Sequence, residues 1–255
     1  MRRVQAPGLH RAGRGGYMER QPSGVLVIPD VHLKTWMFDR ADSILESGQA
    51  DMAVCLGDIV DDWGMQFQLH MYEEILKRAE RFHTEHPDTL WCIGNHDFSY
   101  LYGYDETGFS GVALYTAERG LRSLYETAGG NAAYIHRVNR CIFSHGGLSE
   151  RFCIEYAGDV HGDIDAVIDR INSLKSTTMW QDHSPLWERP NYSGDRMFNC
   201  GYMQVVGHTP VEKPLKLKNT LITDTFSTRR NRTPIGNQRF IIVDTVRKKW
   251  KYAEE

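Results

Sequence analysis

The sequence lacks a long hydrophobic run and a large net charge, and each absence excludes a class of protein. No stretch approaches the roughly 18 apolar residues that a membrane-spanning helix requires. The net charge of −3 over 255 residues gives no overall attraction to nucleic acids or anionic membranes. We therefore expect neither a membrane association nor a stable nucleic-acid partner.

Cysteine is scarce and does not follow a disulfide or zinc-binding pattern. The five cysteines are an odd number and contain no Cys-x-x-Cys pair. Three of them, Cys55, Cys92 and Cys141, stand in apolar segments of strand length. Buried, reduced thiols that act as small hydrophobic residues explain this usage. The interpretation predicts a reducing compartment, the cytoplasm.

The first 23 residues differ in composition from the rest of the chain. They carry five arginines among Gly, Pro and Gln, and they lack the apolar core of a secretory signal. We expect residues 1–23 to be a disordered tail or a non-native extension, since Met18 can also serve as the initiator. Residues 24–255 are expected to form one domain, because the chain is short for two enzyme domains.

Short apolar runs alternate with longer segments of helical periodicity from residue 25 onward. Strands are predicted at 25–28, 52–56, 90–93, 133–138, 141–144, 202–206, 221–223 and 240–243. Helices are predicted within 67–85, 112–128 and 164–174. Strands and helices alternate early in the chain, and strands predominate later. This order indicates an α/β layered domain with mixed sheets.

Five of these strands are followed by a turn that bears Asp, Asn or His. The turns contain Asp30 and His32, then Asp58 and Asp61, then Asn95 and His96, then His145, and finally His208. Ligands bind at the carboxyl ends of strands in open α/β sheets. Glycine next to most of these residues allows a sharp turn and a close approach of the backbone.

The residue types in these turns are metal ligands. They offer carboxylate oxygens, an amide oxygen and imidazole nitrogens, but no thiolate, which suits Mn, Fe, Zn or Mg. The set is larger than one tetrahedral metal needs. Two metals about 3.5–4 Å apart, which share a carboxylate, would use all of it.

The five motifs together resemble a known family. In order, Asp-x-His, Gly-Asp-x-x-Asp, Gly-Asn-His-Asp, His-Gly-Gly and Gly-His-Thr-Pro are similar to the motifs of calcineurin-like metallophosphoesterases. The run at 145–148 is similar to the phosphoprotein phosphatase branch, with its bacterial and phage members. The resemblance covers residues 25–244. It implies a four-layer α-β-β-α sandwich of two mixed β-sheets flanked by helices, with a dinuclear metal site at the strand C-terminal ends.

The resemblance also implies metal ligands by matching position. They are Asp30 and His32 on the first metal, Asp58 shared by both metals, and Asn95, His145 and His208 on the second. Many relatives have a further His where this chain has Pro210, so the first metal is expected to have only three protein ligands. We expect two divalent ions, manganese first, with iron, zinc or magnesium as alternatives.

The implied reaction is hydrolysis of a phosphate ester by a hydroxide that bridges the two metals. His96 resembles the family's general acid, and Asp61 resembles the carboxylate that orients this His and keeps it protonated. A purely structural role for His96 is the alternative.

Recognition of the phosphate is where the resemblance weakens. Protein phosphatases usually carry Arg directly after Gly-Asp-x-x-Asp, but this chain has Asp62 there. An acidic side chain would repel phosphate, so Asp62 either turns away or indicates a different substrate. Arg189 and Arg196 are the two arginines expected to compensate, and Arg189 is favoured.

Three functions remain open. The first is a phosphatase acting on phosphate monoesters, such as phosphoserine, phosphothreonine or phosphotyrosine in proteins. The second is a phosphodiesterase or pyrophosphohydrolase acting on nucleotides such as dinucleoside polyphosphates. The third is an inactive binding scaffold, which the complete set of ligands disfavours. Aromatic residues within 159–199 either line a substrate rim or cover the core, and Asp224 is expected to contact a ligand histidine.

Overall fold

Two mixed β-sheets form the centre of the fold. The computed structural model describes residues 22–254 apart from 161, 191, 193, 195 and 200. Residues 1–23 were expected to be a disordered tail or a non-native extension. Residues 1–21 of this segment lie outside the described residues. Contacts of the domain already involve Ser23, whose backbone N–H donates to Asp51 Oδ2 at 2.8 Å.

The first sheet has six strands. Their order is β11 (Lys249–Tyr252), β10 (Ile241–Asp244), β1 (Gly24–Ile28), β2 (Met52–Cys55), β3 (Leu90–Cys92) and β4 (Ala132–Ala133). Strands β1 to β4 are parallel to one another, whereas β10 is antiparallel to β1 and to β11. The carboxyl ends of β1, β2 and β3 therefore meet at one edge of this sheet.

The second sheet has five strands. Their order is β5 (Ile135–Val138), β6 (Cys141–Ser144), β7 (Met203–Val206), β9 (Thr220–Ile222) and β8 (Leu215–Leu217). Strands β6, β7 and β9 are parallel, and the two edge strands are antiparallel to their neighbours. The sequence patterns did not predict β8 or β11, which are partly exposed strands; β8 has one Lys between two Leu residues, and Lys alternates with aromatic residues in β11.

The apolar run at 133–138 was predicted as one strand, and this prediction was wrong. The chain leaves the first sheet after β4 and enters the second at β5, with Tyr134 between them. Both parts are edge strands of their sheets. Periodicity alone could not show the crossing, because the residues on both sides of it are apolar.

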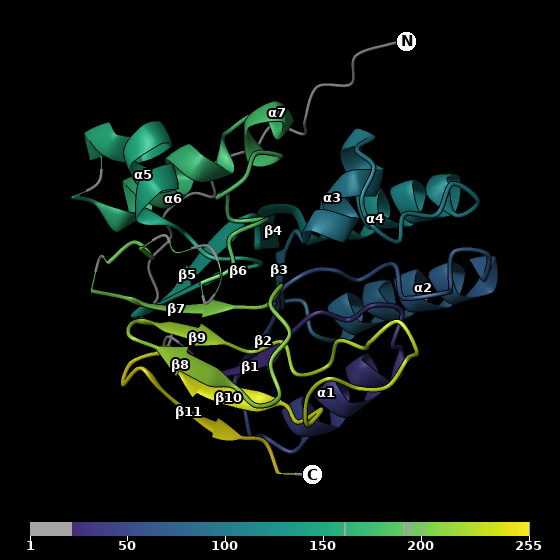
Figure 1. Cartoon of the computed structure of the whole chain (residues 1–255). Helices are drawn as coiled ribbons and strands as arrows, with labels where there is room; N and C mark the ends of the chain where they lie inside the picture. The colour runs from purple at the N-terminus through teal and green to yellow at the C-terminus, as the bar shows by residue number, and fades with distance from the viewer. Residues whose placement is uncertain are drawn as a thin grey trace.

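Helices cover the outer faces of both sheets (Figure 1). The structure has α1 (Trp36–Glu46), α2 (Leu69–Glu85), α3 (Asn95–Tyr102), α4 (Leu114–Ala128), α5 (Glu150–Ala157), α6 (Ile164–Asn172) and α7 (Ser176–Met179), with short 3-10 helices at Gly129–Asn131 and Gly158–Val160. Helices α1, α2 and α4 pack on the first sheet, and α5 and α6 pack on the second. The expected layers are confirmed.

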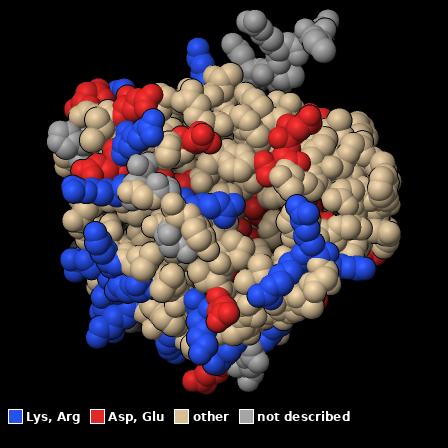
Figure 2. All heavy atoms as spheres, in the orientation of Figure 1, with Lys and Arg blue, Asp and Glu red and all other residues tan. Residues whose placement is uncertain are grey.

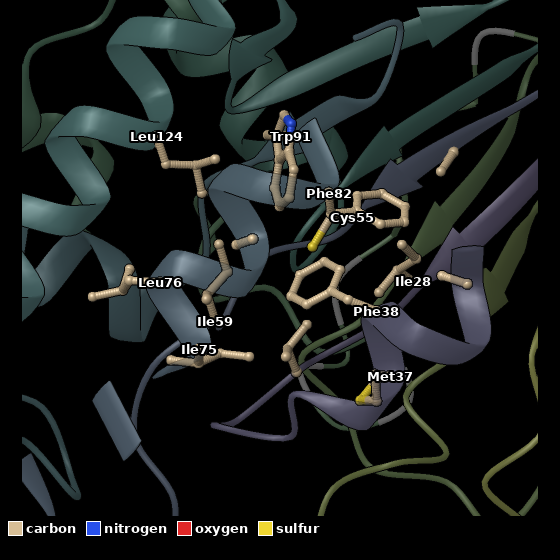
Figure 3. Close-up of a cluster of buried hydrophobic side chains, with 14 of the residues drawn as sticks. Ile28, Met37, Phe38, Cys55, Ile59, Ile75, Leu76, Phe82, Trp91 and Leu124 are labelled. Carbon is tan, nitrogen blue, oxygen red and sulfur yellow. The ribbon is translucent and has the colours of Figure 1, made fainter. Parts of the chain in front are cut away.

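Alternation along the strands divides the core into layers. In β1, Val25 and Val27 point between the sheets, whereas Leu26 and Ile28 point toward the helices. Figure 3 shows the helix side, where Phe38 and Phe82 lie close to Trp91. Because the central strands β1, β2, β6 and β7 are buried on both faces, they read as continuous apolar runs. In the part of the chain that the structure describes, no helix has the length and apolarity to cross a bilayer.

Truncation of a side chain in the layer between the sheets should cause a large loss of stability. Phe143 on β6 is fully buried there. We expect Phe143→Ala to lower the free energy of unfolding by about 3–5 kcal/mol, because it removes a large buried ring and leaves a cavity. Urea unfolding measures this. Phe67→Ala is the control, since Phe67 is 80% exposed, and its effect should stay within about 0.5 kcal/mol. Equal effects of the two changes would contradict the layer assignment.

Candidate active site

The turns that carry the predicted site residues converge at one edge of the two sheets. Turns after β1, β2 and β3 of the first sheet meet turns after β6 and β7 of the second. The structure thereby brings together all six predicted metal ligands and the predicted acid pair, namely Asp30, His32, Asp58, Asp61, Asn95, His96, His145 and His208. Residues up to 178 positions apart in sequence are in hydrogen-bond contact here.

Backbone hydrogen bonds hold the turns against each other. The carbonyl of Asp58 accepts the N–H groups of Val31 and His32, at 3.0 and 2.8 Å. Buried Asp97, the last residue of Gly-Asn-His-Asp, accepts the N–H of Ile59 through Oδ1 at 2.8 Å. The sequence had assigned no role to Asp97. Its side chain ties the turn after β3 to the turn after β2.

Two glycines allow carboxylates to approach the backbone closely. A Cβ on Gly94 would collide with Asp58, and a Cβ on Gly207 would collide with Asp30. Neither glycine has a left-handed backbone, so close packing is the reason for glycine at both positions. The Gly-Asn-His-Asp and Gly-His-Thr-Pro motifs therefore begin with glycine because a carboxylate of another turn lies against it.

Four of the site residues have left-handed backbone conformations. The φ angles are 46° at His32, 49° at Asp58, 64° at Asp61 and 58° at His208. Such conformations cost non-glycine residues on the order of 1–3 kcal/mol each and concentrate at functional sites. The surrounding fold holds these side chains at an energetic cost, which favours a function at this position.

One cluster joins the two sheets at Asp58. His145 Nε2 lies 3.3 Å from Asp58 Oδ2, 2.8 Å from Asn95 Oδ1 and 3.1 Å from His208 Nδ1. His145 Nδ1 contacts the carbonyl of Leu56 at 2.9 Å. A backbone carbonyl at one ring nitrogen fixes the tautomer and leaves the other nitrogen to bind a metal. The donors of this cluster are those expected for the second metal.

The other cluster also includes Asp58. His32 Nε2 is 3.8 Å from Asp58 Oδ2, and His32 Nδ1 contacts the carbonyl of Asp61 at 2.9 Å. His32, Asp58 and His96 place possible ligand atoms within 4.8 Å of one another. Asp30 is buried beside them, and its carboxylate accepts the backbone N–H of His208 at 2.9 and 3.1 Å.

The electrostatics of the two clusters favour cations. Burial raises the pKa of Asp30, and the nearby carboxylates of Asp224 and Asp58 raise it further. His208 Nε2 is buried and has no hydrogen-bond partner among the described residues. Packed carboxylates and an imidazole nitrogen without a partner are costly unless a cation binds them. The oxygen and nitrogen donors fit divalent metals such as those expected from the sequence.

His96 and Asp61 form a hydrogen-bonded pair at the same site. His96 Nδ1 lies 3.0 Å from Asp61 Oδ2. The other Asp61 oxygen accepts the hydroxyl groups of Tyr72 and Tyr100, at 2.7 and 2.6 Å. Burial lowers the pKa of His96, but the charge of Asp58 and the hydrogen bond to Asp61 outweigh it and raise the pKa to about 9.

The two tyrosines were not predicted from the sequence. Tyr72 lies within α2, and Tyr100 lies within α3, so neither belongs to a strand-end motif. The only signal was the position of Tyr72 on the apolar face of its helix, which indicates burial and not a hydrogen bond.

A cavity of about 480 Å³ opens over these groups. In Figure 2, acidic side chains lie at the bottom of a hollow on this face, and basic side chains lie along its edge. Arg189 lines the cavity and donates to the backbone carbonyl of His208. Arg196 does not line it; this exposed side chain lies in a separate depression with Glu150 and Gly194. Of the two expected arginines, only Arg189 is therefore at the site.

The cavity rim consists of residues outside the five strand-end motifs. They are Asp62 and Trp63, the segment 106–108, and residues 227–230 with Ile235.

The aromatic residues of 159–199 mainly cover the core. Trp180 stacks on Phe98 and Tyr104, and Trp187 packs edge-on against His208. Asp224 accepts the N–H groups of Phe226 and Ser227 rather than a ligand histidine.

The two sheets and the clusters of possible metal ligands at their edge are features of a metallohydrolase. The model of the family described as calcineurin-like phosphoesterase matches residues 24–225, so the chain belongs to that family and is a hydrolase that depends on a dinuclear metal centre. No curated protein matches the chain significantly.

Solved structures share this fold. A cold-active protein-tyrosine phosphatase from a psychrophilic Shewanella species is 18% identical, with a TM-score of 0.52, and the match covers 91% of this chain and 80% of that one. Another structure of a cold-active protein tyrosine phosphatase, also 18% identical, gives a TM-score of 0.51 with coverage of 91% and 79%. At these identities the likeness concerns the fold.

The central position of Asp58 predicts the effect of its removal on metal content. We expect Asp58→Asn to lose metal at both positions, because the side chain faces both ligand clusters. Metal per chain, measured by mass spectrometry after dialysis, should fall from two toward zero. Asp62→Asn is the control, since Asp62 lines the same cavity outside both clusters, and it should keep both ions. Two ions in Asp58→Asn would refute the shared position.

Proposed function

We propose that this chain is a phosphatase that hydrolyses phosphate monoesters, with phosphorylated protein side chains as its first substrate class. The His96–Asp61 pair beside two ligand clusters carries the proposal, since it supplies a proton donor where a leaving group would depart. Asp30, His32 and Asp58 would hold the first cation, and Asp58, Asn95, His145 and His208 the second. Bound cations would lower the pKa of water and neutralise phosphoryl charge.

His96 acts as the general acid in this proposal. Asp61 binds Nδ1, so Nε2 is the nitrogen that gives its proton to the leaving oxygen. A cation would neutralise part of the charge on Asp58, which leaves Asp61 as the group that keeps His96 protonated. Tyr72 and Tyr100 hold the Asp61 carboxylate in place and leave its other oxygen for His96.

Arg189 binds the phosphate group in this proposal. It is half-buried and lines the cavity beside His208. Its backbone contact fixes the guanidinium, so little side-chain entropy is lost when it binds phosphate oxygens.

Manganese is the proposed metal. The cytoplasm is the proposed compartment, since Cys55, Cys92, Cys141 and Cys153 are buried free thiols.

Replacement of His96, the proposed general acid, should slow turnover without loss of metal. We expect His96→Asn to lower kcat by about 10²–10⁴-fold, the usual contribution of a general acid. Asp61→Asn should lower it in the same direction. Phosphate release from p-nitrophenyl phosphate and from phenyl phosphate measures this. The loss in kcat should be smaller for p-nitrophenyl phosphate, because p-nitrophenol is the better leaving group. Equal losses for both esters, or unchanged turnover, would remove His96 from the acid role.

The substrate class is tested by phosphate release from manganese-loaded protein. A phosphopeptide mixture is compared with a dinucleoside tetraphosphate at equal concentrations. Faster turnover of phosphopeptides is the expected result. Faster cleavage of the nucleotide would replace the proposal by a pyrophosphohydrolase. A protein that binds both metals and cleaves neither substrate would be evidence for the inactive scaffold.

A further inference from the structure

Asp62 occupies the place of an expected phosphate-binding arginine, and the structure shows what it does instead. Its Oδ1 accepts the hydroxyl of Thr228 at 2.8 Å, and Lys34 Nζ lies 3.5 Å from its Oδ2. Asp62 and Thr228 are 166 positions apart in sequence. The acidic side chain therefore binds a segment of the C-terminal part of the chain to the metal-site turns.

That segment, residues 227–235, forms a short basic turn. The N–H of Ile235 donates to the carbonyl of Ser227 at 2.9 Å, and the N–H of Arg229 donates to the carbonyl of Thr233 at 2.9 Å. Ser227 also donates its N–H to buried Asp224 at 3.0 Å. We call residues 227–235 the basic turn, because it carries Arg229, Arg230 and Arg232.

Two of these arginines line the cavity. Arg229 and Arg230 belong to its wall, together with Thr228. The guanidinium of Arg230 lies 5.2 Å from the ring centroid of Trp63, and Arg229 Nη1 donates to the carbonyl of Pro234 at 3.0 Å. Both guanidinium groups are thus held by neighbouring residues. Arg232 is exposed in the same turn and does not belong to the cavity lining.

The position of this pair differs from that of Arg189. Arg189 contacts the backbone at His208, next to the buried ligand clusters. Arg229 and Arg230 are exposed residues of the wall. Three arginines belong to the cavity lining, namely Arg189, Arg229 and Arg230, and two of them therefore come from the basic turn; Glu106 is also part of the lining. A substrate group that extends from the reacting phosphate toward this turn meets two guanidinium groups.

We propose that Arg229 and Arg230 bind a second phosphate group of the substrate, adjacent to the one that is hydrolysed. Asp62 and Thr228 are positioning residues that hold the basic turn in place. This inference rests on the proposed phosphatase function. Paired guanidinium groups suit a phosphate dianion, because each can donate two hydrogen bonds to its oxygens. The charge that is missing at position 62 is thereby supplied by the basic turn, for a different part of the substrate.

The test uses substrate pairs that differ only by the second phosphate. One pair is a nucleoside 3′-monophosphate and the corresponding 3′,5′-bisphosphate, and the other is a peptide with one or with two adjacent phosphoserines. For Arg229→Ala and Arg230→Ala, KM should rise about tenfold or more for the doubly phosphorylated member of at least one pair. KM for the single phosphate and all kcat values should change little. The pair that responds identifies the source of the second phosphate.

Arg232→Ala is the matched control, since it removes an arginine of the same turn outside the cavity, and it should behave as the unchanged protein. Equal KM changes for both members of each pair, or no change in either, would overturn the proposal. Thr228→Val should reproduce part of the KM effect, and Thr228→Ser, which keeps the hydroxyl, should restore it. An unchanged Thr228→Val variant would overturn the positioning role.

A binding measurement separates this inference from the proposed function. Calorimetry with manganese-loaded protein compares inorganic pyrophosphate with inorganic phosphate. Pyrophosphate should bind more tightly, and Arg229→Ala and Arg230→Ala should lose this advantage while Arg232→Ala keeps it. If no substrate is hydrolysed, the phosphatase proposal fails, and this comparison still decides whether the arginines bind a second phosphate. Equal binding of the two anions would overturn the inference.

Discussion

The site depends on the burial of Asp58 between two groups of ligands. Its carbonyl fixes the turn after β1, its Oδ1 accepts the N–H of His96 at 3.0 Å, and its Oδ2 faces His145 and His32. One residue thus determines the relative positions of turns from both sheets. An isolated buried carboxylate is costly, and this one is stabilised because the imidazoles of His145 and His32 lie near its Oδ2. Burial alone would raise the pKa of Asp58, but the charges of His145 and His96 hold it well below the usual value.

The neighbouring groups divide into two electrostatic environments. Asp30 lies among carboxylates, and its pKa is raised. His96 lies between Asp58 and Asp61, and its pKa is also raised. The first environment favours cations, and the second retains a proton. Both are found within one cavity because the turn after β2 supplies Asp58 to the ligand clusters and Asp61, three residues later, to the acid pair.

The strand-end motifs predicted the layers of the fold and the residues that meet at the sheet edge. This was possible because residues such as Asp30 and His32 directly follow a buried strand, so local sequence determines where they lie. The cavity rim could not be predicted in the same way. Thr228 and Arg230 reach the site through contacts with Asp62 and Trp63, far away in sequence. Tyr100 is similar, since nothing near it in sequence indicates that it contacts Asp61. Arg196 was expected at the site from its place before the last motif, but its side chain is exposed elsewhere.

The crossing of the chain at Tyr134 has a mechanical consequence. Edge strands β4 and β5 are joined by this residue, so the two sheets are covalently connected along one side. The proposed ligands Asp58 and Asn95 belong to turns of the first sheet, whereas His145 and His208 belong to turns of the second. A cation bound by all four residues would link the two sheets through its coordination bonds. Sliding of one sheet over the other would then require release of the ion, so metal affinity adds to the resistance of the sandwich against shear.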